Sequence, residues 1–423
     1  MNDFWKIFET IVEIPRCSGD ARAMGIFIEK WIKDHGYSLK VDKTGNVLAT
    51  HPDARVTLQA HYDMVCLGKA PDIKLIHEKG KIKADKSTLG ADNGIGVAMM
   101  LEAMQMGLAV DCLFTTDEEI GLIGANNLEL KIKTAYVLNL DSEEEESVFI
   151  GCAGGVDMQG RMKLQRTLVK KGLLLESTIS NLPGGHSGLE IDKKIPNANI
   201  ELAKRLTNYQ DIKLISIEGG ERRNSIPKAA KARFIASSDS LDHHVKELGQ
   251  IDEPIYVYEG CEKLLSSLAL MPHGVKQMNK QYNIPQSSLN FASMKIVDDI
   301  LVVDFSLRAM DMYSMDVMVG QTVHQLEAMG FTVRHEEKYP AWAPIQTEFA
   351  TIVGDVVKEV EGFVEYKAIH AGLECGVLQR KAPKIEFASI GPNIGNAHTT
   401  KEYVEKRSCE SFREIVLKVI NEV

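Results

Sequence analysis

The stretch LFTTDEEIGLIGA, residues 113–125, sets a short apolar run directly before two adjacent glutamates, Glu118 and Glu119. Neighbouring residues on an extended strand point in opposite directions, so both carboxylates can face one site only if the strand has already ended. The stretch therefore predicts a buried strand that stops near Thr116, followed by a loop in which the two acids have separate duties.

The first 150 residues continue this alternation of apolar strands and amphipathic helices. Nearly continuous apolar runs predict strands, and apolar residues at helical spacing predict the helices between them. The expected helices are 4–12, 21–35 and 94–107, and the expected strands are a pair within 38–50, then 56–60, 111–116 and 135–141. Buried strands that alternate with helices indicate an α/β domain with a mostly parallel central sheet.

The pattern changes after residue 158, where longer alternating strands dominate. Strands are expected at 162–182, 228–237, 287–310 and 331–339, and helices at 197–209, 241–251 and 315–330. From about residue 340 the earlier style returns, with helices at 349–360 and 407–423 and a strand at 384–391. We therefore predict an α/β domain of two segments, 1–158 and 336–423, interrupted by an inserted α+β domain of two related lobes at 159–335.

The composition excludes several classes of protein. The chain has 423 residues and a formal net charge of −10 without a basic stripe, which argues against nucleic-acid binding. No window approaches the run of about 18 apolar residues that a membrane span needs. The seven cysteines form no CxxC pair, so we expect neither a disulfide nor a thiolate zinc site, and a cytoplasmic protein.

Acids and histidines gather in the loops that follow the predicted strands. They are His61, Asp63, Glu118, Glu119, Asp141 and His398, together with Asp92 at a helix start. In open α/β sheets the carboxyl ends of the strands form the binding edge. Imidazole and carboxylate without thiolate suit Zn²⁺, Mn²⁺ or Co²⁺, and five ligands with one shared carboxylate fit two ions. Asp63, two residues after His61, could hold the second nitrogen of that imidazole.

Each of these residues also has a simpler explanation when it is taken alone. Asp92 could be a helix N-cap, His398 could be an ordinary loop histidine, and the acidic run 142–146 could be a solvated loop. It is their convergence on one edge that favours a metal site.

Nine motifs in order along the chain carry a family resemblance. HYD, TLGADNGIG, TTDEEIG, NLDSEEEE, GCAGG, GGHSG, RNSIP, IHAGLECG and SIGP resemble those of the aminoacyl-histidine dipeptidases (peptidase D), over nearly the whole chain. These enzymes form a branch of the dinuclear zinc exopeptidases, which also include glutamate carboxypeptidase and aminoacylase. The resemblance implies a zinc-binding α/β domain interrupted by a lid domain. It also implies a metallo-exopeptidase that hydrolyses unblocked dipeptides, including Xaa-His and β-Ala-His.

The resemblance also implies a role for each residue of the metal loops. His61 and Asp141 would hold one zinc, Glu119 and His398 the other, and Asp92 would bridge them, preceding a cis peptide bond to Asn93. Asp63 would orient His61. Glu118 would be the general base that takes a proton from the water between the two ions and passes it to the departing amine.

Four further residues are expected to meet the substrate. The resemblance implies that His186 in GGHSG stabilises the tetrahedral oxyanion, from the lid. Arg308 can bind the C-terminal carboxylate bidentately and Asn224 can donate to it, although Arg222 and Arg223 could compete for this role. Glu374 could meet the free amine, or it could be a solvated acid in a hinge loop. The lid could supply His186 to its own chain or, in a homodimer, to its partner.

Two other functions remain open from the sequence. An aminoacylase-type amidohydrolase would use the same metal chemistry on N-acyl amino acids, and substrate trials with free and blocked amines distinguish the two. A catalytically dead binding protein on this fold would have lost a ligand or the base, and here each of them is present.

Overall fold

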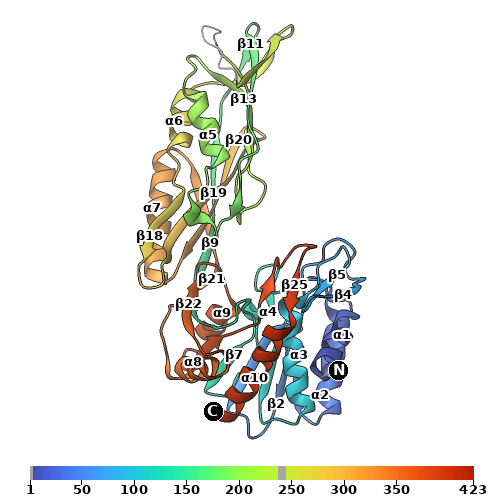
Figure 1. The fold of residues 1–423 in the computed structure, drawn as a ribbon. Helices are drawn as coiled ribbons and strands as arrows, with labels where there is room; N and C mark the ends of the chain where they lie inside the picture. The colour runs from blue at the N-terminus through green and yellow to red at the C-terminus, as the bar shows by residue number, and fades with distance from the viewer. Residues whose placement is uncertain (1–2, 237–243) are drawn as a thin grey trace. The chain divides into compact units, whose positions relative to one another are not determined.

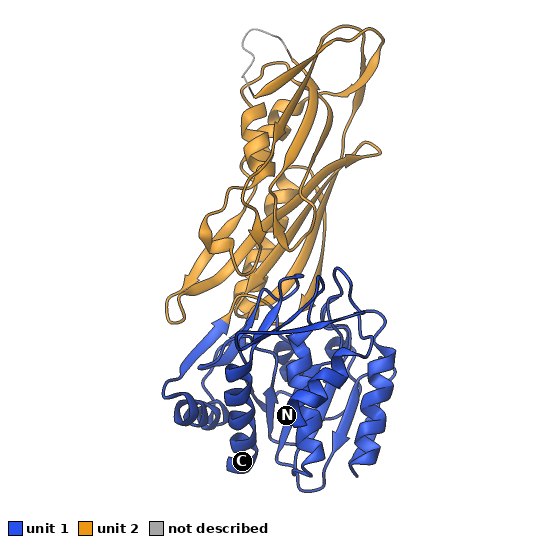
Figure 2. Ribbon diagram, turned by 45° about the vertical axis from the view of Figure 1, so that its right-hand side comes forward, with its two compact units in different colours: residues 1–152, 342–368, 372–423 blue, residues 153–341, 369–371 orange. Residues whose placement is uncertain are grey.

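The structure is a computed structural model that describes residues 3–236 and 244–423. The chain divides into two compact units, coloured separately in Figure 2. Unit 1 comprises residues 1–152, 342–368 and 372–423, and unit 2 comprises residues 153–341 and 369–371. The insertion expected at 159–335 falls within the bounds of unit 2.

An eight-stranded sheet forms the centre of unit 1 (Figure 1). Its order is β1 (Ser38–Val41), β2 (Val47–Thr50), β6 (Asp111–Thr115), β3 (Val56–His61), β7 (Tyr136–Asn139), β23 (Glu386–Ser389), β8 (Ser147–Cys152) and β22 (Glu365–Ile369). The four middle strands, β6, β3, β7 and β23, run parallel. The predicted α/β class with a mostly parallel centre is therefore confirmed. A small sheet of β24 (Ile394–Gly395), β25 (Tyr403–Glu405), β5 (Lys81–Ala84) and β4 (Leu75–Glu78) accompanies it.

Helices pack on this sheet through their apolar faces. They are α1 (Asp3–Val12), α2 (Arg22–Asp34), α3 (Ala91–Gln105), α4 (Ile123–Asn126), α8 (Glu348–Glu361), α9 (Glu374–Lys381) and α10 (Lys406–Glu422). Nearly every residue of α3 is buried, because α3 lies on β3 and is covered in turn by α1 and α10. Its apolar residues therefore surround the helix instead of forming one stripe.

Unit 2 is built on a second sheet of eleven strands. Its main path is β16 (Val245–Gln250), β11 (Leu173–Ile179), β15 (Ala230–Ile235), β13 (Lys213–Gly219), β19 (Ile284–Val297), β20 (Ile300–Ala309), β9 (Gly154–Lys163) and β21 (Thr332–Tyr339). The remaining strands are β10 (Arg166–Val169), β17 (Ile255–Tyr258) and β18 (Gly274–Asn279). Helices α5 (Ala198–Leu206) and α6 (Cys261–Ala269) pack together, and α5 lies against β11, β15, β13 and β19. Helix α7 (Met312–Ala328) lies against β19, β20, β9 and β21. This arrangement accounts for the two lobes expected from the sequence.

The helix expected at 241–251 is wrong where the structure describes it. Residues Val245–Gln250 form β16, an edge strand paired antiparallel with β11, while 241–243 lie outside the described residues. The apolar residues of this segment recur at helical spacing, but Gly249 has a φ of +108° and the register shifts beside it. Pairing with the free edge of β11 therefore outweighed the local pattern.

The expectation that no disulfide forms is also wrong. Cys17 and Cys66 are bonded, with their Cα atoms 5.4 Å apart, although 49 positions separate them. Backbone hydrogen bonds bring the two segments together: Met64 N donates to Arg16 O and Ser18 N donates to Met64 O. Sequence spacing does not reveal such a pairing. The other five cysteines are buried thiols, and the cysteine content no longer supports a reducing compartment.

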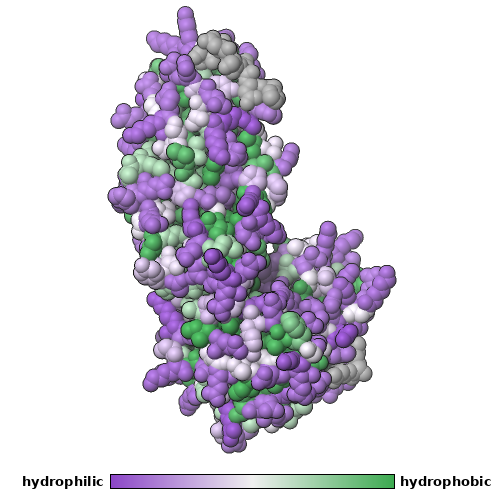
Figure 3. Space-filling view, turned by 60° about the vertical axis from the view of Figure 1, so that its left-hand side comes forward, coloured by the Kyte–Doolittle hydropathy of each residue, from purple (hydrophilic) through white to green (hydrophobic). Residues whose placement is uncertain are grey.

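Hydrophilic side chains dominate the molecular face drawn in Figure 3, with hydrophobic residues in small patches between them. Within the described part of the chain, no helix combines the length and the apolarity that are needed to cross a bilayer.

Candidate active site

The parallel strands of unit 1 explain why the predicted metal loops meet. His61 is the last residue of β3, Glu118 and Glu119 follow β6, Asp141 follows β7, and His398 lies in the chain beyond β23. These four strands are neighbours and run in the same direction, so their carboxyl ends lie at one edge of the sheet. Residues distant in sequence therefore converge there for a topological reason.

The two adjacent glutamates are separated by a turn of the backbone. Asp117 has a left-handed φ of +52°, which ends the extended chain directly before Glu118. Asp63, which is fully buried, accepts hydrogen bonds from the backbone N–H groups of Glu118 at 3.1 Å and Glu119 at 3.4 Å. The Oγ of Ser18 donates to the same carboxylate at 2.7 Å. Asp63 therefore fixes the loop on which both glutamates lie.

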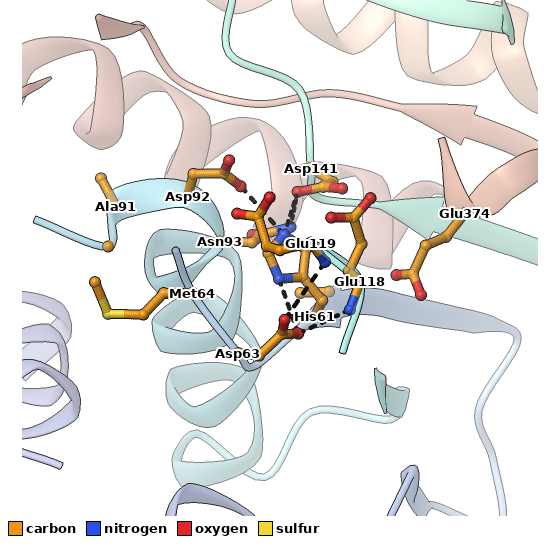
Figure 4. Close-up of polar contacts among 12 residues, drawn as sticks. His61, Asp63, Met64, Ala91, Asp92, Asn93, Glu118, Glu119, Asp141 and Glu374 are labelled. Carbon is orange, nitrogen blue, oxygen red and sulfur yellow. Dashed lines mark hydrogen bonds and ion pairs between the residues drawn. The ribbon is translucent and has the colours of Figure 1, made fainter. Parts of the chain in front are cut away.

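Asp92 lies between the two histidines. Its Oδ1 is 3.2 Å from His61 Nε2, and its Oδ2 is 3.0 Å from His398 Nε2. Asp141 Oδ1 is also 3.2 Å from His61 Nε2, and Glu119 Oε2 is 2.9 Å from His398 Nε2. Figure 4 shows Asp92, Asp141 and Glu119 directed toward one space beside His61. One carboxylate with an oxygen toward each imidazole has the geometry of a bridging ligand.

The donor set fits divalent cations. Three groups bring their ligand atoms within 4.8 Å of one another: His61 with Asp92 and Asp141, His61 with Glu118 and Glu119, and Asp92 with Glu119 and His398. Glu119 Oε1 is buried and has no hydrogen-bond partner. More carboxylates than imidazoles gather in this buried space, and such an excess of negative charge needs cations to balance it.

The pKa values report the same excess of negative charge. Although burial opposes its protonation, the surrounding carboxylates of Asp141, Asp63 and Asp92 raise the pKa of His61 well above its usual range. Hydrogen bonds that its imidazole donates to the Asp92 and Glu119 carboxylates raise the pKa of His398 to about 11. Burial raises the pKa of Asp141 to about 6. In the absence of metal ions these side chains therefore tend to bind protons, and bound cations would displace those protons.

The Glu118 carboxylate differs from those of its neighbours in its lack of hydrogen-bond and ion-pair partners among the described residues. Among the described residues none forms a hydrogen bond or ion pair with the Glu118 side chain, whereas Glu119 pairs with His398. Burial raises the pKa of Glu118 well above its usual range, and the Asp141 and Glu119 carboxylates raise it further. An unengaged carboxylate of high pKa beside the metal ligands has the properties of a general base.

In unit 2, β12 (Gly185–His186) pairs antiparallel with β14 (Ser225–Ile226), and Asn224 directly precedes β14. His186 and Asn224 both line a cavity of about 460 Å³. His186 Nδ1 accepts hydrogen bonds from the backbone N–H groups of Gly188 and Leu189, each at 3.2 Å. In the neutral ring the proton is therefore on Nε2, the nitrogen that could donate to an oxyanion.

Arg308, on β20, is a buried cation without an acidic partner among the described residues. It is 6% exposed, its Nη1 donates to the Tyr339 hydroxyl at 2.7 Å, and its Nε has no hydrogen-bond partner. Arg223, the competing candidate, pairs with Asp157 at 3.1 Å and with Asp304 at 2.9 Å. The charge of Arg223 is therefore balanced within the protein, whereas that of Arg308 is available to a ligand.

Arg308 and His186 approach each other around Gly188. A Cβ added at Gly188 would lie 3.1 Å from His186 Cε1 and 3.3 Å from Arg308 Cζ. The GGHSG motif thus brings a hydrogen-bond donor and a cation together in unit 2.

Glu374 is fully buried at the start of α9, so it is not a solvated hinge residue. Its Oε2 accepts hydrogen bonds from Gln59 Nε2 and Thr115 Oγ1, both at 2.6 Å, and its Oε1 has no partner. Burial raises its pKa to about 7. Figure 4 shows Glu374 beside Glu118.

Some contacts that support the site could not be predicted from the sequence. Buried Arg16 donates to the carbonyl oxygens of Tyr62 at 3.3 Å and Asp63 at 3.0 Å. Asn93 donates to Asp141, and the peptide bond between Asp92 and Asn93 is cis, as the resemblance implied. Arg16 carries no local signal, because its partners are backbone atoms of a distant segment.

Comparison with known proteins gives the family. Residues 57–422 match Peptidase family M20/M25/M40. The chain belongs to this family. It is 29% identical to the cytosol non-specific dipeptidase of Escherichia coli (strain K12), over 99% of this chain and 97% of that protein.

Solved structures share the fold of this chain. The crystal structure of aminoacylhistidine dipeptidase from Vibrio alginolyticus matches with a TM-score of 0.81 and 26% identity, over 100% of this chain and 96% of that one. A tripeptidase from Staphylococcus aureus shares the fold with a TM-score of 0.62 and 15% identity, over 99% and 97%. The predicted recognition as a metallopeptidase of the dipeptidase branch, and the predicted hydrolase class, are confirmed. The aminoacylase alternative is not favoured.

Proposed function

We propose that this M20 peptidase is a cytoplasmic dipeptidase that hydrolyses unblocked dipeptides, including Xaa-His substrates such as β-Ala-His, with two Zn²⁺ ions as its cofactors. Its similarity to a cytosol non-specific dipeptidase and to an aminoacylhistidine dipeptidase supports the substrate class and the compartment. The observation that carries the proposal is the position of Asp92 between the imidazoles of His61 and His398, beside an unengaged Glu118.

The ligand assignment follows the distances in unit 1. His61 and Asp141 would hold one ion, Glu119 and His398 the other, and Asp92 would bridge them. When bound, the two ions would supply Lewis acidity that lowers the pKa of the attacking water and polarises the scissile carbonyl. Mn²⁺ and Co²⁺ accept the same imidazole and carboxylate donors and would be possible substitutes.

Glu118 would move the proton. Its raised pKa favours accepting a proton from the attacking water and later donating it to the departing amine. Asp63 lies 3.4 Å from His61 Nδ1, on the far side of that ring from Asp92, and would keep the imidazole oriented.

Residues of unit 2 would bind the rest of the substrate. His186 Nε2–H would donate to the developing oxyanion, and Arg308 and Asn224 would bind the C-terminal carboxylate. Arg308 is buried and has no acidic partner in the part of the chain that the structure describes, which supports this assignment, because a ligand carboxylate would supply that partner. Glu374, with a free buried oxygen, would face the substrate amine from unit 1.

A substrate panel tests the proposal. Purified protein loaded with Zn²⁺ is assayed against free dipeptides, including β-Ala-His, and against N-acetyl amino acids and tripeptides. We expect hydrolysis of the free dipeptides and a lower kcat/KM for both other classes. Preferential hydrolysis of the N-acetyl amino acids would refute the dipeptidase assignment in favour of an amidohydrolase.

A mixing experiment tests which chain supplies His186. We infer that His186 serves the site of its own chain, since unit 2 carries both lobes in one sheet. A homodimer stays a prediction. Chains with His186→Ala and chains with Glu118→Gln are denatured, mixed and refolded together. We expect no recovery of activity, whereas recovery would show that a partner chain supplies the histidine.

A further inference from the structure

Glu402 is a buried acid that accepts four consecutive backbone hydrogen bonds. Glu402 is 2% exposed. Oε2 accepts from the N–H groups of Leu89 at 2.7 Å and Gly90 at 3.0 Å, and Oε1 accepts from Ala91 at 2.8 Å and Asp92 at 3.3 Å. No ion pair to Glu402 is formed by any residue that the structure describes. The charge of this carboxylate is therefore stabilised by main-chain donors at the start of α3.

The four amides belong to the turn that carries Asp92. That turn must place one oxygen of Asp92 toward His61 and the other toward His398, at 3.2 Å and 3.0 Å. Glu402 itself lies four positions after His398, in the same loop. The Glu402 carboxylate therefore connects the loop that carries His398 to the backbone turn that carries Asp92.

Arg16 also binds this turn, but as a hydrogen-bond donor to its backbone carbonyl oxygen. Its Nη2 donates to the carbonyl oxygen of Gly90, and its Nη1 donates to Tyr62 O and Asp63 O beside His61. Arg16 is 1% exposed. Glu402 binds the N–H groups of the turn while Arg16 binds a carbonyl, so two buried charges of opposite sign fix its backbone.

We propose that Glu402 is a positioning residue for the bridging carboxylate. Through the amides of residues 89–92 it sets the placement of Asp92 relative to both imidazoles, and so controls how tightly the site binds its metal ions. The metal-binding part of this inference rests on the proposed function of Asp92. Residues that orient metal ligands commonly change metal affinity about 10- to 100-fold when they are replaced.

The variant Glu402→Gln tests this role at nearly constant shape. A glutamine keeps one oxygen for two of the N–H groups, but it presents its own NH₂ to the other two, where donor faces donor. Glu405→Gln is the matched control: Glu405 lies three positions on and pairs with Lys81 at 3.0 Å, with both side chains about a third exposed. Glu402→Asp keeps the charge and shortens the reach.

Two measurements separate positioning from a general structural role. Hydrogen–deuterium exchange of the metal-free protein should be about 10-fold faster over residues 89–92 in Glu402→Gln than in the wild type or the control, since two hydrogen bonds are lost. Competition of Zn²⁺ with a chelator should show at least one ion bound about 10- to 100-fold more weakly. A purely structural residue would lower the melting temperature and leave the affinity of the folded protein unchanged.

The outcomes are distinct. Exchange and zinc affinity within twofold of the wild type would overturn the proposal, and so would failure of both Glu402 variants to fold, because the carboxylate would then serve the fold itself. Asp92→Ala is the reference for the proposed function. If it still binds two Zn²⁺ ions, the bridging role fails, whereas faster exchange in Glu402→Gln would remain as evidence for the backbone contact alone.

Discussion

Replacement of Arg308 by alanine gives the sharpest prediction about substrate binding. The guanidinium is 6% exposed, has no acidic partner among the described residues, and donates only to the Tyr339 hydroxyl. If it binds the substrate carboxylate, the variant leaves that carboxylate unpaired. Loss of one partner from such a desolvated charge pair costs about 2–5 kcal/mol, which lowers kcat/KM about 30- to 5,000-fold.

The same variant should leave the fold nearly intact. Because Arg308 forms no ion pair with any described residue, the variant loses one hydrogen bond and some packing, and this loss is offset by removal of a buried charge. We expect the free energy of unfolding to change by about 1 kcal/mol or less. Arg223→Ala is the control, since Arg223 already pairs with Asp157 and Asp304, and its kcat/KM should stay within about twofold of the wild type.

The assay compares a dipeptide with its C-terminal amide in both proteins. The kcat/KM of the wild type for the amide should be as low as the kcat/KM of Arg308→Ala for the free dipeptide. The variant should no longer distinguish the two substrates. Arg308→Lys should be intermediate, because an ammonium cannot bind bidentately. The reasoning is refuted if the variant prefers the free dipeptide as strongly as the wild type does, or if Arg223→Ala shows the larger loss.

Three further predictions concern the base, the disulfide and a buried histidine. Glu118→Gln should retain its metal content and lose about 100- to 10,000-fold in kcat, measured by steady-state assay and elemental analysis. Denatured, unreduced protein should titrate five thiols and reduced protein seven, and reduction of the 17–66 bond should lower the free energy of unfolding by about 4 kcal/mol or less. Burial, with a contribution from Arg308, lowers the pKa of His370 to about 3, so below about pH 6.5 the unfolded chain binds a proton that the folded chain does not. The free energy of unfolding should therefore decrease as the pH is lowered, with about 2 kcal/mol of the decrease between pH 7 and pH 5 coming from His370. His370→Gln should remove this contribution.

Each of these has a clear contrary result. Activity of Glu118→Gln within a few-fold of the wild type would remove it as the base. Seven thiols in unreduced protein would show that Cys17 and Cys66 are not bonded. An unchanged pH slope in His370→Gln would mean that this imidazole does not resist protonation as its burial implies.

Much of the fold could be predicted because burial leaves a local pattern. The strands β3, β6 and β7 are buried and mostly apolar, and each is followed by polar residues, so the sequence showed both the strand and the position of the loop that carries the site residues. Segment 245–250 was mispredicted for the converse reason. It is a mostly exposed edge strand whose apolar residues recur at helical spacing, and its pairing with β11 decides its conformation.

The sequence by itself determined the chemical content of the site: imidazole and carboxylate side chains, no thiolate, and an extra glutamate at a strand end. Tertiary structure alone decided which groups are partnered. It paired Arg223 with two acids and left Arg308 without one among the described residues. It also joined Cys17 to Cys66 and placed Glu402 on the amides of residues 89–92. Local patterns record which face of an element is buried, whereas these contacts join backbone and charges across long separations and leave no periodic trace in the chain.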